Sequence, residues 1–103
     1  MSGKTKRKIV WSISASNELR NIIVFIKKNS IQNSQKVKQE VLNKITALTD
    51  NPERYPADKF KLLNTNNNFR AFELHKIRVS YFVDASQIMI IRVRHVKQEP
   101  LFY

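Results

Sequence analysis

The chain has 103 residues, a length that suits one domain over residues 1–103 with a single hydrophobic core. Hydrophobic residues make up 42% of the sequence, which excludes a disordered tail. The 19 Lys and Arg exceed the 8 Asp and Glu by 11 charges, so an anionic partner is expected, and nucleic acid comes before an acidic membrane or protein surface. Residues 1–7 are predicted to be a basic N-terminal arm, because their Lys and Arg side chains have no apolar partner.

Missing or rare residue types exclude several classes of function. The sequence has no cysteine, which excludes disulfides, thiolate metal sites and catalytic thiols. Its one glycine, Gly3, cannot supply the glycine-rich loops that bind ATP or NAD, and neither His75 nor His95 has the spacing of a metal site. No apolar run approaches the roughly 20 residues that span a bilayer. We therefore expect a soluble cytoplasmic protein with no membrane contact, metal or cofactor.

The first half of the chain begins with a predicted strand and helix. Apolar residues at 9, 11 and 13 alternate with the residues between them, which predicts a short strand over residues 8–13. Apolar residues then recur at helical spacing: Leu19, Ile22, Ile23 and Ile26. They predict an amphipathic helix over residues 14–28, with Ser14 or Ser16 as its N-cap.

A second helix and a long loop are predicted next. Apolar residues again repeat at helical spacing: Val37, Val41, Ile45 and Leu48. This helix is predicted to end before Pro52, because a proline disfavours helix at the preceding residue, so residues 14–50 form a helical hairpin. Residues 51–68 hold two of the three prolines and an asparagine run, which predicts a connecting loop that carries Lys59 and Lys61.

The last part of the chain predicts three strands. Alternation of period 2 marks residues 69–73, 76–83 and 87–96. Short connections make successive strands antiparallel neighbours. The predicted fold is therefore α+β, with an N-terminal strand and a two-helix hairpin packed on a mainly antiparallel four-stranded sheet.

Alternation in these strands separates a core face from a basic face. The core face is predicted to hold Ile77, Val79, Tyr81, Val83, Met89, Ile91 and Val93, with His95 at its end. The other face should place Arg78, Arg92 and Arg94 together, joined by Arg70 if the register allows. Arginines beside aromatic rings suit phosphate binding and base stacking. A solvated face or a dock for an acidic partner would have the same pattern, and Glu73 suits a salt bridge as well as a general base.

Taken in order, these segments resemble the RelE/ParE superfamily of bacterial toxins from type II toxin–antitoxin modules. The resemblance runs nearly end to end. Its most specific parts are Lys76 to Tyr81, similar to the family's arginine-x-x-tyrosine strand, and Ile91 to Tyr103, similar to its arginine-valine-x-histidine ending. It implies a toxin that inhibits bacterial growth and that is neutralised by a cognate antitoxin protein.

The resemblance leaves three activities open. RelE-like members cleave mRNA on the ribosome without a metal, ParE-like members poison DNA gyrase, and an inert relic would only bind its antitoxin. Ribosome-dependent mRNA cleavage, an endoribonuclease activity, is placed first, because the chain keeps candidates for the nuclease residues. The implied catalytic residues are Arg78, Arg70, Tyr103, Glu73 and His95, and the implied RNA-binding residues are Lys59, Lys61, Arg92 and Arg94.

Metal-free cleavage would have the deprotonated 2′-hydroxyl attack the adjacent phosphodiester and expel the 5′-oxygen, which takes up a proton, while cations stabilise the developing charge. Arg78 and Arg70 would stabilise this charge, and Tyr103, Glu73 or His95 would exchange protons. The phenol of Tyr103 would need nearby cations to lower its pKa from about 10. This interpretation predicts an exposed Arg78 and a Tyr103 surrounded by positive charge, on one concave surface.

Overall fold

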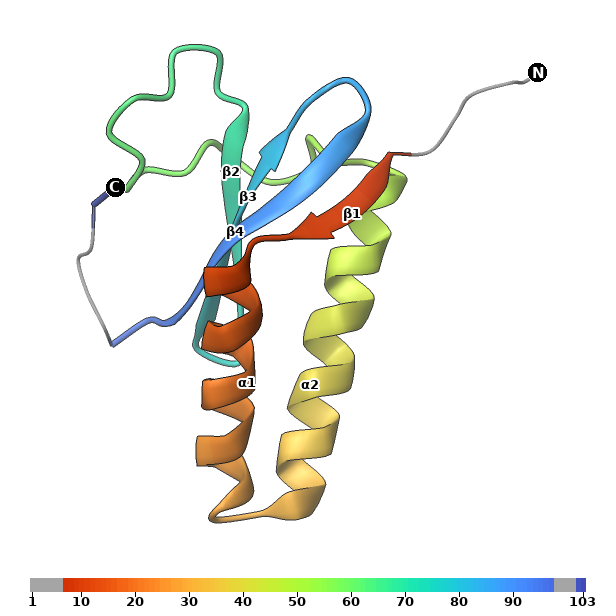
Figure 1. Cartoon of the computed structure of the whole chain (residues 1–103), viewed down its shortest axis with the longest axis vertical. Coiled ribbons are helices and arrows are strands. Elements are labelled where there is room, and N and C mark those ends of the chain that lie inside the picture. The colour runs from red at the N-terminus through yellow and green to blue at the C-terminus, as the bar shows by residue number, and fades with distance from the viewer. Residues whose placement is uncertain (1–6, 98–101) are drawn as a thin grey trace.

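The computed structural model describes residues 7–97 and 102–103, in which a strand and two helices precede a three-stranded meander (Figure 1). The elements are β1 (Lys8–Trp11), α1 (Ile13–Lys27), α2 (Ile31–Thr46), the 3₁₀ turn η1 (Ala47–Thr49), β2 (Phe69–Leu74), β3 (Ile77–Val83) and β4 (Gln87–His95). This order confirms the predicted α+β fold. Most of the predicted basic arm lies outside the described residues. Its last residue, Arg7, donates from Nε to the carbonyl of Asp84 at 2.7 Å.

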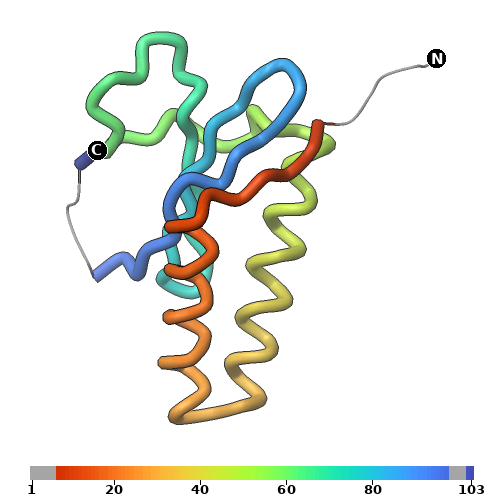
Figure 2. The backbone as a smooth tube through the Cα atoms, in the orientation of Figure 1, coloured from red at the N-terminus to blue at the C-terminus, as the bar shows by residue number. Residues whose placement is uncertain are grey.

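The four strands form one sheet in the order β1-β4-β3-β2. Strand β1 runs parallel to β4, with Lys8 opposite Gln87, whereas the other two pairs are antiparallel. Helices α1 and α2 run side by side as a hairpin that extends past the end of the sheet (Figure 2). Within the described part of the chain, neither helix is long and apolar enough to cross a membrane.

The core lies between the helical hairpin and one face of the sheet. Its most deeply buried side chains are Tyr81, Ile45, Leu48, Ile77, Ile88, Ile90, Val41, Val79 and Val93. The predicted core face of β3 is confirmed, because Ile77, Val79, Tyr81 and Val83 are all buried.

A buried tyrosine and a short bridge hold the loop between η1 and β2 against the sheet. The hydroxyl of Tyr81 donates to the carbonyl of Pro52 at 2.9 Å, and burial raises the pKa of this phenol to about 12. Further along the loop, Ala57 forms an antiparallel bridge with Arg70 of β2. The next amide, that of Asp58, donates to the carbonyl of Phe69 at 2.8 Å. The loop therefore follows the edge of β2 and carries Asp58 toward the sheet.

Strand β4 contains a β-bulge in the middle of its pairing with β3. Ser80 lies opposite Arg92, but the next residue, Tyr81, lies opposite Ile90. Ile91 is therefore the extra residue of the bulge, and the alternation of side chains shifts by one position there.

The bulge corrects part of the predicted core face. Ile88 and Ile90 are fully buried, so the prediction that Met89 and Ile91 face the core is wrong. Strict alternation fails because the extra residue shifts the pattern: even-numbered residues face the core before the bulge, and odd-numbered residues face it afterwards. Beyond it, Val93 is buried as predicted, and Arg92 lies on the opposite face.

The start of α1 is joined to this bulge. Strand β1 ends at Trp11, and the N-cap of α1 is Ser12, not the predicted Ser14 or Ser16. The Ser12 hydroxyl accepts from the amide of Ala15 at 3.0 Å and donates to the carbonyl of Ile91 at 2.9 Å. Further along α1, Glu18 accepts from the amide of Val93 at 2.8 Å. Two polar side chains, one at the N-cap and one within α1, therefore satisfy backbone groups beside the bulge.

We expect Ser12→Ala to lower the free energy of unfolding by about 1–2 kcal/mol, because the substitution removes both the helix cap and the hydrogen bond to Ile91. The matched control is Ser14→Ala, at an exposed position inside α1. Urea unfolding followed by circular dichroism measures both variants. Equal midpoints for the two would contradict the role given to Ser12.

Candidate functional site

The sheet face that the helices leave uncovered carries a small cavity of about 130 Å³, which we call the arginine pocket. It is lined by Lys59, Phe60, Glu73, Arg78, Ser80, Arg92, Arg94, His95, Val96 and Tyr103. Most of the predicted site residues are therefore brought together, and Lys61 and Arg70 are the two that do not line the pocket.

Strand register explains why three arginines meet in the pocket. Arg78 lies opposite Arg94, and Ser80, two residues further along β3, lies opposite Arg92. Residues that face each other across an antiparallel pair point to the same side of the sheet. Because the bulge at Ile91 shifts the alternation, β4 can bury its isoleucines and still present both arginines to the pocket.

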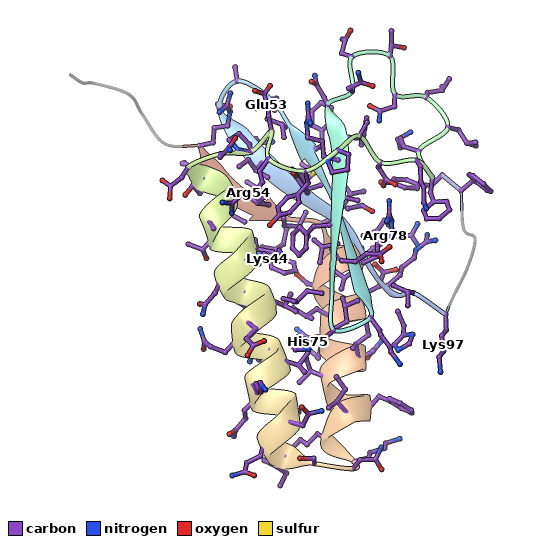
Figure 3. The ribbon with its side chains drawn as sticks, turned by 180° about the vertical axis from the view of Figure 1, so that it is seen from behind. Lys44, Glu53, Arg54, His75, Arg78 and Lys97 are labelled. Atoms are coloured by element: carbon purple, nitrogen blue, oxygen red, sulfur yellow. The ribbon has the colours of Figure 1, made fainter. Side chains whose placement is uncertain are left out.

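Arg70 does not share this face, so the register does not allow it to join the other three arginines. It lies opposite the core residue Tyr81, so it points to the other side of the sheet. Its guanidinium donates to the carbonyls of Tyr55 at 2.7 Å and Glu53 at 3.4 Å. Figure 3 shows Glu53 in the loop above α2, apart from Arg78 beyond β2. Arg70 therefore fixes the loop.

The arginine pocket is organised by Asp58, which the sequence interpretation missed. Its carboxylate side chain is 0% exposed. It accepts hydrogen bonds from Arg78 Nη2 at 2.8 Å, from the Tyr103 hydroxyl at 2.5 Å and from the Phe60 amide at 3.0 Å. The last of these is an Asx turn, the only feature of this residue that its local sequence signals. The two distant donors become visible only in the folded chain.

Hydrogen bonds keep this buried carboxylate charged. Burial alone would raise the pKa of Asp58, but the hydrogen bonds from Tyr103, Arg78, Phe60 and Ser80 outweigh it and hold the pKa below its ordinary value. The pKa of Arg78 moves the other way: burial lowers it, and the two carboxylates around the guanidinium raise it overall.

Arg78 is enclosed, which corrects the expectation of an exposed arginine. Its side chain is only 16% exposed. Besides its contact with Asp58, it donates from Nη1 to Glu73 at 2.8 Å, and its guanidinium lies 4.7 Å from the ring centroid of Phe60. Both terminal nitrogens of Arg78 are therefore bound to carboxylates of the same chain.

Tyr103 is held in place by the loop. Its amide donates to the carbonyl of Phe60 at 2.9 Å, and its carbonyl accepts from the amide of Leu62 at 2.6 Å. Burial and the hydrogen bond to Asp58 raise the pKa of the phenol. The expected lowering of this pKa by surrounding cations is therefore wrong, because the nearest hydrogen-bond partner is an anion.

The remaining predicted residues lie at the sides of the pocket. Arg92 pairs with Glu18 of α1, at 3.2 Å from Nη2. Burial and the neighbouring charge of Arg92 lower the pKa of Arg94. His95 lies opposite the core residue Ile77, as the alternation predicted, at the end of β4.

Two lysines of the loop lie over aromatic rings at the pocket. Lys59 Nζ lies 5.3 Å from the ring centroid of Phe60. Lys61 Nζ lies 4.7 Å from the ring of Phe69 and 5.3 Å from that of Tyr103. The predicted RNA-binding lysines therefore sit on aromatic rings at cation–π distance.

Comparison with known proteins identifies the family of this chain. Residues 9–100 match the family described as "ParE toxin of type II toxin-antitoxin system, parDE". The chain belongs to the ParE toxin family. It is therefore a RelE/ParE superfamily member and the toxin component of a type II toxin–antitoxin system.

A solved structure supports the same fold for this ParE family member. The structure is described as "Chromosomal ParDE TA system from P. aeruginosa", and the TM-score is 0.67. The comparison covers 87% of this chain and 96% of that chain at 14% sequence identity, so the likeness shows the fold alone. No protein with curated annotation matches the sequence.

We expect Arg78→Ala to destabilise the toxin by about 3 kcal/mol or more, because it leaves the carboxylate of Asp58 buried without its ion-pair partner. The matched control is Arg54→Ala, which removes an exposed arginine and should change stability by no more than about 0.5 kcal/mol. Guanidinium unfolding compares the two variants. A fully stable Arg78→Ala protein would contradict the ion-pair account.

The charge of Asp58 also predicts a dependence of stability on pH. Its folded pKa is lowered, so its contribution is fully present above the unfolded value near pH 4 and is lost as the pH falls through the folded pKa. Asp58→Asn removes this group. The difference in unfolding free energy between the parent and Asp58→Asn should therefore be largest near neutral pH and shrink in acid, as measured by urea unfolding across the range. A difference independent of pH would contradict the prediction.

Proposed function

We propose that the protein inhibits bacterial growth by poisoning DNA gyrase, and that a cognate antitoxin neutralises it. Membership of the ParE family supports this target, since gyrase is the target of ParE-like toxins within the superfamily. The observation that carries the choice against mRNA cleavage is the ion pairing of Arg78. Both of its terminal nitrogens are held at 2.8 Å by carboxylates of the chain, Asp58 and Glu73.

A nuclease site needs cations that stabilise charge as it develops on the phosphate. To serve in this way, Arg78 would have to leave Asp58, and the buried carboxylate would lose its ion-pair partner at a large energetic cost. Arg70, the second candidate for this role, binds loop carbonyls on the other face of the sheet. The Tyr103 hydroxyl donates a hydrogen bond to Asp58, and its raised pKa makes the phenol a poor base near neutral pH. These three arrangements support a ParE-like activity.

Ribosome-dependent mRNA cleavage is the second candidate, because one observation favours it. Arg78, Tyr103, Glu73 and His95 line a single pocket, as a metal-free nuclease would require. In this proposal Lys59, Lys61, Arg92 and Arg94 hold the RNA, and Arg70 has only a structural role.

Two assays with the purified toxin separate the proposals. In the first, gyrase and supercoiled plasmid are mixed with increasing toxin, and covalently trapped, linear DNA is measured after denaturation. A reaction without gyrase is the control, because a protein with a net charge of +11 binds DNA by charge alone. In the second, ribosomes translate a defined message, and primer extension locates cuts.

We expect dose-dependent linear DNA that requires gyrase, together with an intact message. Cuts in the translated message without trapped gyrase would overturn the proposal in favour of mRNA cleavage. Neither product, from a folded toxin, would identify a protein that only binds its antitoxin.

A further inference from the structure

The loop beside the arginine pocket and the C-terminal segment together expose three large apolar side chains. Leu62 is 69% exposed, Leu63 is 79% exposed and Phe102 is 56% exposed. The hydrogen bond between the Leu62 amide and the Tyr103 carbonyl joins the two segments that carry them. We call these residues the apolar crest. Adjacent exposed apolar side chains of this kind are typical of a binding surface.

Several contacts fix the crest where it joins the rest of the molecule. The ring of Phe102 packs edge-on against Phe60, with centroids 5.4 Å apart. At the far end of the loop, the Asn64 side chain accepts from the Phe69 amide at 3.1 Å and donates to its carbonyl at 2.9 Å. The Asp58 hydrogen bonds hold the base of the crest. A ring fixed in this way loses little conformational entropy when a partner binds.

Cations flank the crest on the same loop. The ammonium groups of Lys59 and Lys61 lie over the rings of Phe60 and Tyr103, each at 5.3 Å. Arg94 lines the same pocket as Lys59. Positive groups that alternate with aromatic rings are the features by which proteins hold single-stranded nucleic acid, since the rings stack on bases and the cations neutralise phosphates.

We propose that this face binds a single strand of nucleic acid. Phe102 stacks on an unpaired base, and Lys59 and Lys61 contact the phosphates on either side. The inference rests on the proposed function in one respect, that the strand is DNA held by gyrase. The toxin would then contact both components of the gyrase–DNA complex. An acidic protein or an anionic membrane would also attract the lysines, but neither offers a base for the ring to stack on.

Binding to a fluorescent thymidine oligonucleotide, measured by anisotropy without gyrase, tests the site directly. Phe102→Ala should weaken binding roughly 5- to 100-fold, because it removes one base–aromatic stack. The control is Phe25→Ala, which removes a phenylalanine that is 66% exposed on α1 and should have no effect. Circular dichroism checks that both variants are folded.

A pair of double variants separates a built site from general charge attraction. The double variant Lys59→Ala with Lys61→Ala should weaken binding. It should also make the plot of log affinity against log salt concentration less steep, by about the amount that two phosphate contacts contribute. Lys36→Ala with Lys38→Ala removes the same charge from exposed positions of α2 and should change binding much less. Equal loss in both pairs, or equal affinity of Phe102→Ala and Phe25→Ala, would overturn the proposal.

Further measurements distinguish the source of the ligand. A ribo-oligonucleotide that binds more than tenfold tighter than its deoxy counterpart would overturn the assignment of the strand to DNA. A Phe102-dependent interaction with phosphatidylglycerol vesicles, with no effect of Phe102→Ala on oligonucleotide binding, would assign the crest to membranes and overturn the proposal.

The gyrase assay is then repeated with Phe102→Ala. Lower trapping of DNA by this variant would support contact with gyrase-held DNA. Unchanged trapping would overturn the inference that the bound strand is DNA held by gyrase. If the parent toxin traps no DNA, the proposed function fails, and Phe102-dependent oligonucleotide binding would still support the nucleic-acid site.

Discussion

The site is built around the buried carboxylate of Asp58. A charge in a protein interior loses its hydration, so it requires donors of its own. Arg78 comes from β3, Tyr103 from the C-terminal segment and the Phe60 amide from the loop, and all three donate to the two oxygens of Asp58. The shape of the arginine pocket follows from this requirement. The same contacts explain why Arg78, although it lies on a basic surface, is paired with carboxylates of its own chain.

The bulge in β4 resolves a conflict in that strand's sequence. Ile88 and Ile90 require the core face, and strict alternation from them would also turn Arg92 inward. One extra residue, Ile91, allows the isoleucines to be buried and the arginine to face the pocket. Helix α1 stabilises the irregular backbone, because Ser12 binds its carbonyl. The position of the helix, the cap and the pocket are therefore coupled through one contact.

Features with a repeating pattern could be predicted from the sequence, and features that depend on register could not. The helices and strands follow from apolar spacing, and alternation in β3 predicted its buried face. Whether Arg70 joins the other arginines depends on which residue of β3 it faces, and that pairing leaves no local signal. The consecutive isoleucines at 90 and 91 fit either face, so alternation alone misplaced the first half of β4. Ser12 was assigned to a strand because its apolar neighbours alternate, although its side chain caps a helix.

Asp58 illustrates a different limit. Its Asx turn is local and could be anticipated from an aspartate in a loop. Its ion pair with Arg78 spans 20 positions, and its contact with Tyr103 spans 45. Charge counting identified an excess of cations but could not show which of them a single carboxylate would bind. The pKa of Tyr103 was predicted in the wrong direction for the same reason.

The parallel pairing of β1 with β4 has a consequence for the order in which the chain folds. Lys8 and its strand find their partner at Gln87, near the other end of the sequence. The helical hairpin depends on contacts between neighbouring segments, so it can form while the chain is still being synthesised. Strand β1 must wait until β4 has left the ribosome. Completion of the sheet is therefore a late event in folding, and the hydrogen bond from the Ser12 hydroxyl to the carbonyl of Ile91 can form only then.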